Sequence, residues 1–200
     1  VVALTAPGRA LDARGASAAR ALTLVPYYAW SNRGAGEMAV WLAREAGAAM
    51  RPPDGLEKTL AARSRVFASH FWRDDRGGAL RDGAAPERAR DNSVPAFSWF
   101  PRRGTRQWVR YEFPGSATVH AVEVFWAASD DERELSPPAS WRLLYRDGTA
   151  WRPVENAGDY GVLEDRFNRL AFAPVRTDSL LIEVQMRKGR SAGIHEWTVE

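Results

Sequence analysis

Cysteine is absent from all 200 residues of the chain. Its absence excludes disulfide bonds, zinc sites built on thiolates and cysteine nucleophiles. Lysine is nearly absent too, because only two of the 28 basic residues are lysines, and the arginines are scattered among acidic residues. A nucleic-acid-binding surface needs basic residues clustered in a stripe, so this pattern argues against nucleic acid as a partner.

Long apolar runs are also missing. The sequence has no stretch long enough to cross a bilayer as a helix, so we expect no membrane partner. Its first residues lack the charged-then-apolar order of a signal peptide, and the chain starts without methionine, which favours a piece of a longer protein. The compartment stays open between secreted, periplasmic and cytoplasmic locations in a bacterium.

Tryptophan and short alternating segments are what the sequence has in abundance. Nine tryptophans in 200 residues predict either a β-rich core or a stacking surface. Period-2 strands separated by turn signals are expected at 65–71, 107–113, 118–126, 140–148, 167–174, 179–187 and 193–199. With no helix among them, these strands predict an all-β fold, an antiparallel sandwich or barrel.

The N-terminal part has a different character. Residues 24–42 read as two short strands around a turn at Ser31–Gly36, and a lone hairpin is marginal in water, so it should belong to a larger sheet. Pro52–Gly55 is a strong stop. We therefore predict terminal strands and a hairpin over 1–44, a linker over 45–62 and a β domain over 63–200.

The β domain resembles the discoidin family (coagulation factor 5/8 type C), a jelly roll also used in family-32 carbohydrate-binding modules. The matching pieces, in order, are Ala68-Ser69 before Trp72, "ALRDG" (79–83), "QWVRYEF" (107–113), "VEVFW" (122–126), "SWRLLYRDGTAWRPV" (140–154) and "AGIHEWTV" (192–199). The resemblance implies an antiparallel jelly-roll β-sandwich of the galactose-binding-domain-like kind.

The hairpin resembles a second family. "LVPYYAWSNRGAGEMAVWL", Leu24 to Leu42, is similar to the end of the catalytic unit in glycoside hydrolase family 127, the β-L-arabinofuranosidase-like enzymes. This implies that the hairpin is the remnant of an upstream β-sandwich following an (α/α) barrel of the same polypeptide. The family's nucleophile is a cysteine in a thiolate-rich zinc site, with glutamates for acid/base work. Because this chain has no cysteine, the resemblance implies that the chain alone is not an enzyme.

A sugar-binding site needs an exposed aromatic face with charged or amide groups that bind hydroxyls. The candidates on the predicted loop over 72–105 are Trp72, Arg76, Trp99, Phe100, Arg102 and Arg103. We therefore predict a non-catalytic carbohydrate-binding or accessory domain of a family-127-like hydrolase acting on arabinofuranoside-containing glycans. The alternative is a purely structural sandwich, in which these aromatics cover its end, that packs on the catalytic domain without sugar affinity.

The discoidin resemblance also implies a structural Ca²⁺ near the Asp-Gly loop, closed by a glutamate in the last strand. Asp82 and Glu196 lie at the matching points. Further oxygen ligands would come from Asp91, Asn92 or Ser93. The alternative is that Asp82 only makes an Asx turn and that Glu196 pairs with an arginine.

The remaining polar candidates favour structural roles. His70, His120 and His195 lack metal-ligand spacing, and we expect all three to be structural. The acidic run Ser129–Glu134 offers carboxylates, but such a run before two prolines is typical of a solvated loop. "SWFPRRG", residues 98–104, mixes aromatic and basic residues, yet it is too short a patch to indicate a nucleic-acid site.

Overall fold

The computed structural model describes residues 2–5, 23–32, 36–44, 55, 58–73 and 77–200. The chain divides into two compact units, Val1–Arg51 and Pro52–Glu200. In the first unit, an antiparallel sheet has the order β1–β3–β2. Its strands are β1 (Val2–Thr5), β2 (Thr23–Asn32) and β3 (Gly36–Arg44). The predicted hairpin is confirmed as β2 and β3, and β1 extends it to a sheet.

The second unit is an antiparallel β structure that includes a short 3₁₀ helix, η2 (Gly78–Leu80). Its strands are β4 (Arg65–Ala68), β5 (Phe97–Ser98), β6 (Arg106–Ala127), β7 (Ser140–Asp147), β8 (Ala150–Pro153), β9 (Phe167–Gln185) and β10 (Gly193–Val199). Hydrogen bonds link them in the order β5–β10–β6–β9–β7–β8, with β4 on β6. The all-β prediction is confirmed. Among the described residues, no helix has the length and apolar character needed to span a membrane.

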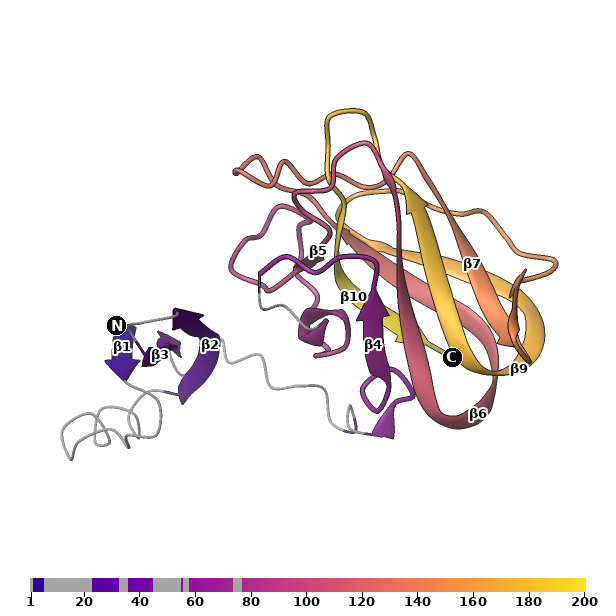
Figure 1. The fold of residues 1–200 in the computed structure, drawn as a ribbon, viewed down its shortest axis with the longest axis horizontal. Helices are drawn as coiled ribbons and strands as arrows, with labels where there is room; N and C mark the ends of the chain where they lie inside the picture. Colours follow the sequence, from indigo (N-terminus) through magenta and orange to yellow (C-terminus); the bar gives the residue numbers. More distant parts are fainter. Residues whose placement is uncertain (1, 6–22, 33–35, 45–54, 56–57, 74–76) are drawn as a thin grey trace. The chain divides into compact units, whose positions relative to one another are not determined.

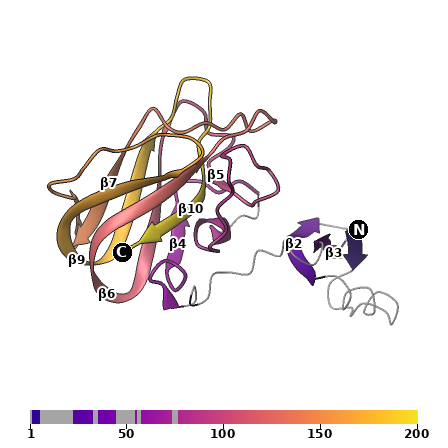
Figure 2. The ribbon, with the colours of Figure 1, turned by 180° about the vertical axis from the view of Figure 1, so that it is seen from behind.

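Strands β6 and β9 take part in both layers of the sandwich, and each curves through the unit (Figure 1 and Figure 2). The first part of β6 pairs with β4 and with the end of β9, which in turn pairs with β7. The second part of β6 pairs with the beginning of β9 and with β10. One layer therefore holds β4, β7 and β8, and the other holds β5 and β10.

The change of layer occurs at a register shift. In β6 the pairing with β9 is interrupted between Glu112 and Ala117, where the sequence reads Phe113-Pro-Gly-Ser116. Such irregularities bend a strand and increase its twist. The strands predicted separately at 107–113 and 118–126 are thus one strand, and so are those predicted at 167–174 and 179–187.

The core lies between the two layers and contains one face of each of the alternating segments 107–113, 118–126 and 179–187. Residues of these faces with 2% exposure or less are Val109, Tyr111, Val122, Val124, Trp126, Ile182, Val184 and Met186. Tyr111 stacks on Trp197 with ring centroids 4.0 Å apart, and the Tyr111 hydroxyl donates to the Leu80 carbonyl at 2.8 Å. The core therefore also fixes η2. Most of the tryptophans whose side chains are described serve this core rather than the surface.

Candidate functional site

The two tryptophans predicted to bind sugar lie in different environments. Trp99 is fully buried, packs edge-on against Phe97 with centroids 4.7 Å apart, and donates from Nε1 to the Trp108 carbonyl at 3.1 Å. Trp72 is only half-buried. No glycan reaches an indole inside the sandwich, so the prediction that Trp99 binds sugar is wrong. Trp99 belongs to the core.

Trp72 and Phe100, here called the aromatic pair, meet on the surface. Their rings are edge to face with centroids 5.8 Å apart, and both side chains are half-buried. Trp72 follows β4 and Phe100 follows β5, so two separate loops supply the pair. The His70 Nε2 lies 3.0 Å from the Phe100 carbonyl oxygen and ties the two loops together. Ring surface of this kind packs well against the C–H faces of sugars.

Three guanidinium groups lie beside the aromatic pair. The Cζ of Arg73 is 4.2 Å from the Trp72 ring centroid, and that of Arg133 is 5.3 Å from it. The Cζ of Arg103 is 5.3 Å from the Phe100 ring centroid. Cation–π contacts contribute about 0.5–1 kcal/mol at exposed sites, so they orient these side chains without locking them.

The predicted arginines have different fates. Arg103 belongs to the site. Arg102 is exposed on the same loop, and its backbone N–H donates to the Trp99 carbonyl at 2.9 Å. Arg76 lies outside the described residues. The two other arginines of the site, Arg73 and Arg133, were not among the predicted ones, because nothing local in the sequence distinguishes them from solvated residues.

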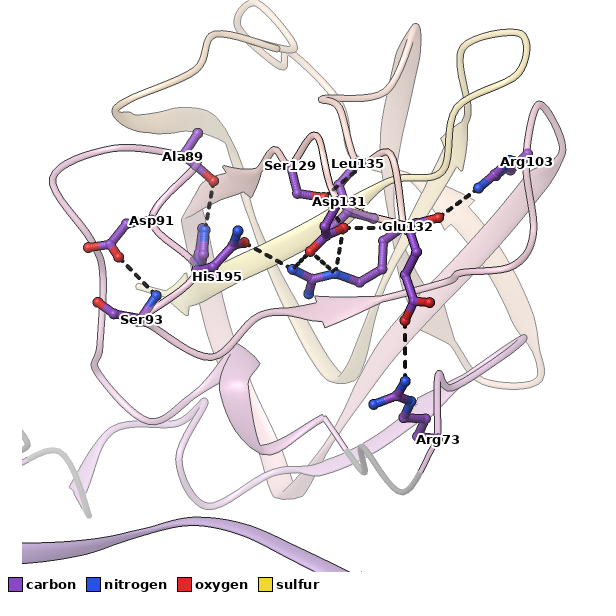
Figure 3. A network of polar contacts seen from close by, with 12 residues as sticks. Arg73, Ala89, Asp91, Ser93, Arg103, Ser129, Asp131, Glu132, Leu135 and His195 are labelled. Atoms are coloured by element: carbon purple, nitrogen blue, oxygen red, sulfur yellow. Dashed lines mark hydrogen bonds and ion pairs between the residues drawn. The ribbon is translucent and has the colours of Figure 1, made fainter. Parts of the chain in front are cut away.

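Residues 129–135, here called the acidic loop, connect to these arginines (Figure 3). The Glu132 carboxylate accepts from Arg73 Nη2 at 3.2 Å, and the Glu132 carbonyl accepts from Arg103 Nη2 at 2.8 Å. Arg103 Nη1 also pairs with Glu134 at 3.0 Å. The sequence predicts a merely solvated loop here. The middle of the loop is exposed, but Glu132 and Glu134 pair with arginines of the candidate site, so that prediction is incomplete.

One arginine holds the acidic loop from within. Arg133 donates from Nη2 and Nε to Asp131 Oδ2 at 2.6 and 2.9 Å, and from Nη2 to Asn92 Oδ1 at 3.0 Å. Ser129 Oγ donates to the same carboxylate at 2.8 Å. These hydrogen bonds, chiefly those from Arg133, lower the pKa of Asp131 to about 2. A paired guanidinium fork of this kind fixes the loop.

Asp82 and Glu196, here called the acid pair, come together as the resemblance implies. Glu196 accepts from the Gly83 N–H at 3.0 Å, and Asp82 accepts from the Ala84 N–H at 2.9 Å, which forms the expected Asx turn. Burial, followed by the neighbouring Asp82 charge, raises the pKa of Glu196 to about 8, and burial raises the pKa of Asp82 to about 6. No ion pair among the described residues includes Glu196.

The other predicted metal ligands do not extend the acid pair. Ser93 donates its backbone N–H to Asp91 Oδ1 at 2.9 Å in a local turn (Figure 3). Within the part of the chain that the structure describes, no group of three or more acidic, histidine or cysteine side chains is arranged so that it could hold a metal ion. The acid pair still fits a hard cation, because both groups are largely buried carboxylates that lie together, and no ion pair among the described residues includes either of them. Backbone carbonyls or water would complete the coordination.

Two of the histidines have structural contacts, as predicted. His195 is buried, and its Nε2 lies 3.0 Å from the Ala89 carbonyl oxygen (Figure 3). Its Nδ1 lies 3.1 Å from the Pro95 carbonyl oxygen. His70 positions the Phe100 loop. His120 is exposed and lies at the second register shift between β6 and β9, between Val119 and Ala121.

The comparison with protein families concerns the first unit. Residues 5–43 match the glycoside hydrolase family 127 C-terminal domain. The match includes β2 and most of β3, the segment whose sequence resembles that family. The matching model describes the C-terminal domain of that family. No curated protein matches the chain significantly.

Solved structures resemble the chain in fold. The Streptococcus pneumoniae beta-galactosidase BgaA is 16% identical, with 68% of this chain and 90% of that chain covered and a TM-score of 0.59. Chitosan-binding module 1 of a chitosanase/glucanase from Paenibacillus sp. IK-5 is 18% identical (71% and 98% covered, TM-score 0.52). The family 32 carbohydrate-binding module of Clostridium perfringens NanJ, solved with galactose, is 12% identical (70% and 96% covered, TM-score 0.51). At such identities the likeness shows the fold alone, and it confirms the predicted jelly roll.

Proposed function

We propose that the second unit is a non-catalytic carbohydrate-binding module whose binding surface is the aromatic pair with its arginines and the acidic loop. The observation that carries the proposal is the aromatic pair itself, two half-buried rings from separate loops with charged groups around them. Rings of this kind take the apolar face of a sugar, and charged groups take its hydroxyls. Two similar folds, the chitosan-binding module and the galactose-bound family 32 module, support the proposal.

The proposed role is to serve a catalytic domain upstream in the same polypeptide. The match of residues 5–43 to the family 127 C-terminal domain supports this, because that model belongs to a glycoside hydrolase family. The module would hold an arabinofuranoside-containing glycan near that domain and raise the effective concentration of substrate. A single shallow site buries little ligand surface, so weak binding is expected.

Tryptophan fluorescence tests the proposal directly. Arabino- and galacto-oligosaccharides from a broad glycan panel should quench emission of the chain, and Trp72→Ala should remove the response. Trp151→Ala is the matched control, because Trp151 is also half-buried but lies on β8. A panel that gives no response by fluorescence or calorimetry overturns sugar binding and favours the purely structural sandwich.

We also propose that the acid pair is the core of a structural Ca²⁺ site. Asp82 and Glu196 would supply carboxylate oxygens, which Ca²⁺ prefers. The ion would offset the cost of charging two carboxylates that burial disfavours, which is the main cause of their raised pKa values. Its effect would be to fasten the Asp82–Ala84 turn to the last strand, β10.

A further inference from the structure

Two of the arginines at the aromatic pair are held by exposed carboxylates of a single loop. Arg73 contacts the Trp72 ring and pairs with Glu132, and Arg103 contacts the Phe100 ring and pairs with Glu134. Each aromatic ring therefore has a guanidinium beside it, and each guanidinium has a carboxylate from the acidic loop. At each ring, the guanidinium therefore lies in contact both with the aromatic ring and with a carboxylate.

These two ion pairs are exchangeable, unlike the third. The side chains of Arg73 and Glu132 are 55% and 64% exposed, whereas Arg133, which holds Asp131, is only 13% exposed. Ion pairs between exposed side chains contribute little to stability, typically about 0–1 kcal/mol. Glu132 can thus leave Arg73 for water at small cost, while Arg133, bonded to Asp131 within the loop and to Asn92 outside it, keeps the loop in place.

We infer that Glu132 and Glu134 occupy the positions of a ligand carboxylate, and that the site takes a glycan bearing uronic acid residues. The sugar ring would lie on the aromatic pair, and its carboxylate would replace the loop carboxylate on Arg73 or Arg103. The inference rests on the proposed function and narrows its ligand class. An arabinofuranoside-containing glycan that also carries uronate is consistent with both the proposed function and this inference.

Guanidinium chemistry favours a carboxylate over a neutral hydroxyl here. A guanidinium matches a carboxylate with two parallel hydrogen bonds, and charge-assisted bonds are roughly twice as strong as neutral ones. A neutral sugar that displaced Glu132 would exchange a charged partner for a hydroxyl, whereas a uronate keeps the charge pairing of Arg73. The Glu132 side chain is already mostly in solvent, so its release from Arg73 changes its hydration little.

The test compares acidic oligosaccharides with their own neutral counterparts. Oligomers of galacturonate, glucuronate and mannuronate, and the same oligomers after reduction of each carboxylate to an alcohol, are titrated into the full chain by calorimetry. We expect at least one acidic oligomer to bind more tightly than its reduced form. This preference should shrink as salt is raised, because exposed charge pairs are screened.

Variants of the acidic loop show whether Glu132 competes with the sugar carboxylate for Arg73 or itself binds the sugar. Glu132→Gln removes the internal carboxylate and should raise the affinity for the acidic oligomer by about two- to fivefold, the range expected from one exposed ion pair. Arg73→Ala and Arg103→Ala should lower it. Glu183→Gln is the matched control and should leave affinity unchanged, because Glu183 pairs with Arg142 and Arg106 on the sheet strands.

The outcomes distinguish this inference from the proposed function. Equal affinity for acidic and reduced oligomers overturns the inference and leaves sugar binding intact. Weaker acidic binding by Glu132→Gln also overturns it, since Glu132 would then be a sugar ligand. If no sugar of any kind binds, the proposed function fails and the inference with it. Circular dichroism and a melting curve for each variant establish that it is folded.

Discussion

The acid pair and the acidic loop both gather carboxylates on the same β unit, yet their electrostatics are opposite. In the acidic loop each of Asp131, Glu132 and Glu134 pairs with an arginine, and the pKa of Asp131 falls to about 2. In the acid pair the partners are backbone N–H groups and another carboxylate, and the pKa of Glu196 rises to about 8. Similar residue types thus prefer a charge at one place and a proton at the other.

The difference follows from burial and from the supply of cations. Glu196 is 3% exposed, so its charge would lose most of its hydration, and its main charged neighbour is Asp82. The carboxylates of the acidic loop face solvent and guanidinium groups. A buried carboxyl pair without a cation is a place for protons or a metal ion, whereas exposed pairs with arginine can exchange partners.

The largest expected effect is a loss of stability as pH rises through the titration of the acid pair. Both groups have folded-state pKa values above their usual 3.8 and 4.5, so the folded state binds protons more tightly than the unfolded state. The stabilisation is complete below about pH 4 and is lost as pH rises through about 6 and then about 8. We expect a loss on the order of 3 kcal/mol across this window, measured by urea unfolding in chelator.

Glu196→Gln sharpens this prediction. The amide keeps an oxygen that can accept from the Gly83 N–H, but it has no proton to titrate and no charge to oppose Asp82. The pH dependence of the free energy of unfolding should therefore flatten in the variant. A wild-type chain whose stability in chelator rises between about pH 5 and pH 8 contradicts the description of the acid pair.

Added calcium should counteract the loss of stability that the acid pair causes at high pH. An ion that binds the deprotonated pair competes with the protons, so added Ca²⁺ should raise the melting temperature more at about pH 8 than at about pH 5. At a concentration 100 times the dissociation constant, the gain is about 2.7 kcal/mol. Glu196→Gln should lose this gain. Equal melting curves with Ca²⁺ and with chelator at both pH values exclude a stabilising calcium ion while leaving the pH prediction intact.

Arg133→Ala should leave a carboxylate of the acidic loop without an arginine partner, as in the acid pair. The substitution leaves Asp131 without its main hydrogen-bond donor and Asn92 without its contact from Arg133, at a cost of about 1–3 kcal/mol. The lowered pKa of Asp131 gives the wild type stability that is present above about pH 4 and is lost as pH falls through about 2, and the variant should lack this acid limb. Unfolding curves at a series of acid pH values measure both effects.

Arg142→Ala is the control for Arg133→Ala. Arg142 pairs with Glu183 at 2.8 Å but is 53% exposed, so its removal should cost less than about 1 kcal/mol and leave the acid limb unchanged. An equal cost for the two substitutions would mean that Arg133 does not hold the loop.

The alternating segments were predictable because burial follows the two-residue period of a strand. Val122, Val124 and Trp126 lie in the core as their spacing indicates. The continuity of β6 was not predictable, since Pro114 and Gly115 read as the end of a strand and only the pairing with β9 shows that the chain bends and continues. A proline followed by a glycine occurs both in a turn that ends a strand and in a bend within a strand, so the sequence does not distinguish the two.

The candidate site divides in the same way. Trp99 was predicted as a loop residue. Phe97 and Trp99 are two residues apart and both point inward beside β10, but this segment is too short to show a two-residue period in the sequence. The acid pair was predicted from a resemblance, and the structure brings the two residues together. The acidic loop was not predicted as part of the site, because Arg73 and Glu132 are 59 residues apart and their contact depends on the fold.

The smallest expected effect tests whether the Arg73–Glu132 pair is exchangeable. Removing either partner should change the free energy of unfolding by less than about 1 kcal/mol, because both side chains are mostly exposed. A double-mutant cycle with Arg73→Ala and Glu132→Gln should give a coupling energy of about 0.5 kcal/mol that disappears at high salt. A coupling above about 2 kcal/mol would make the pair a structural lock like Arg133–Asp131, and a ligand carboxylate could then not take the place of Glu132.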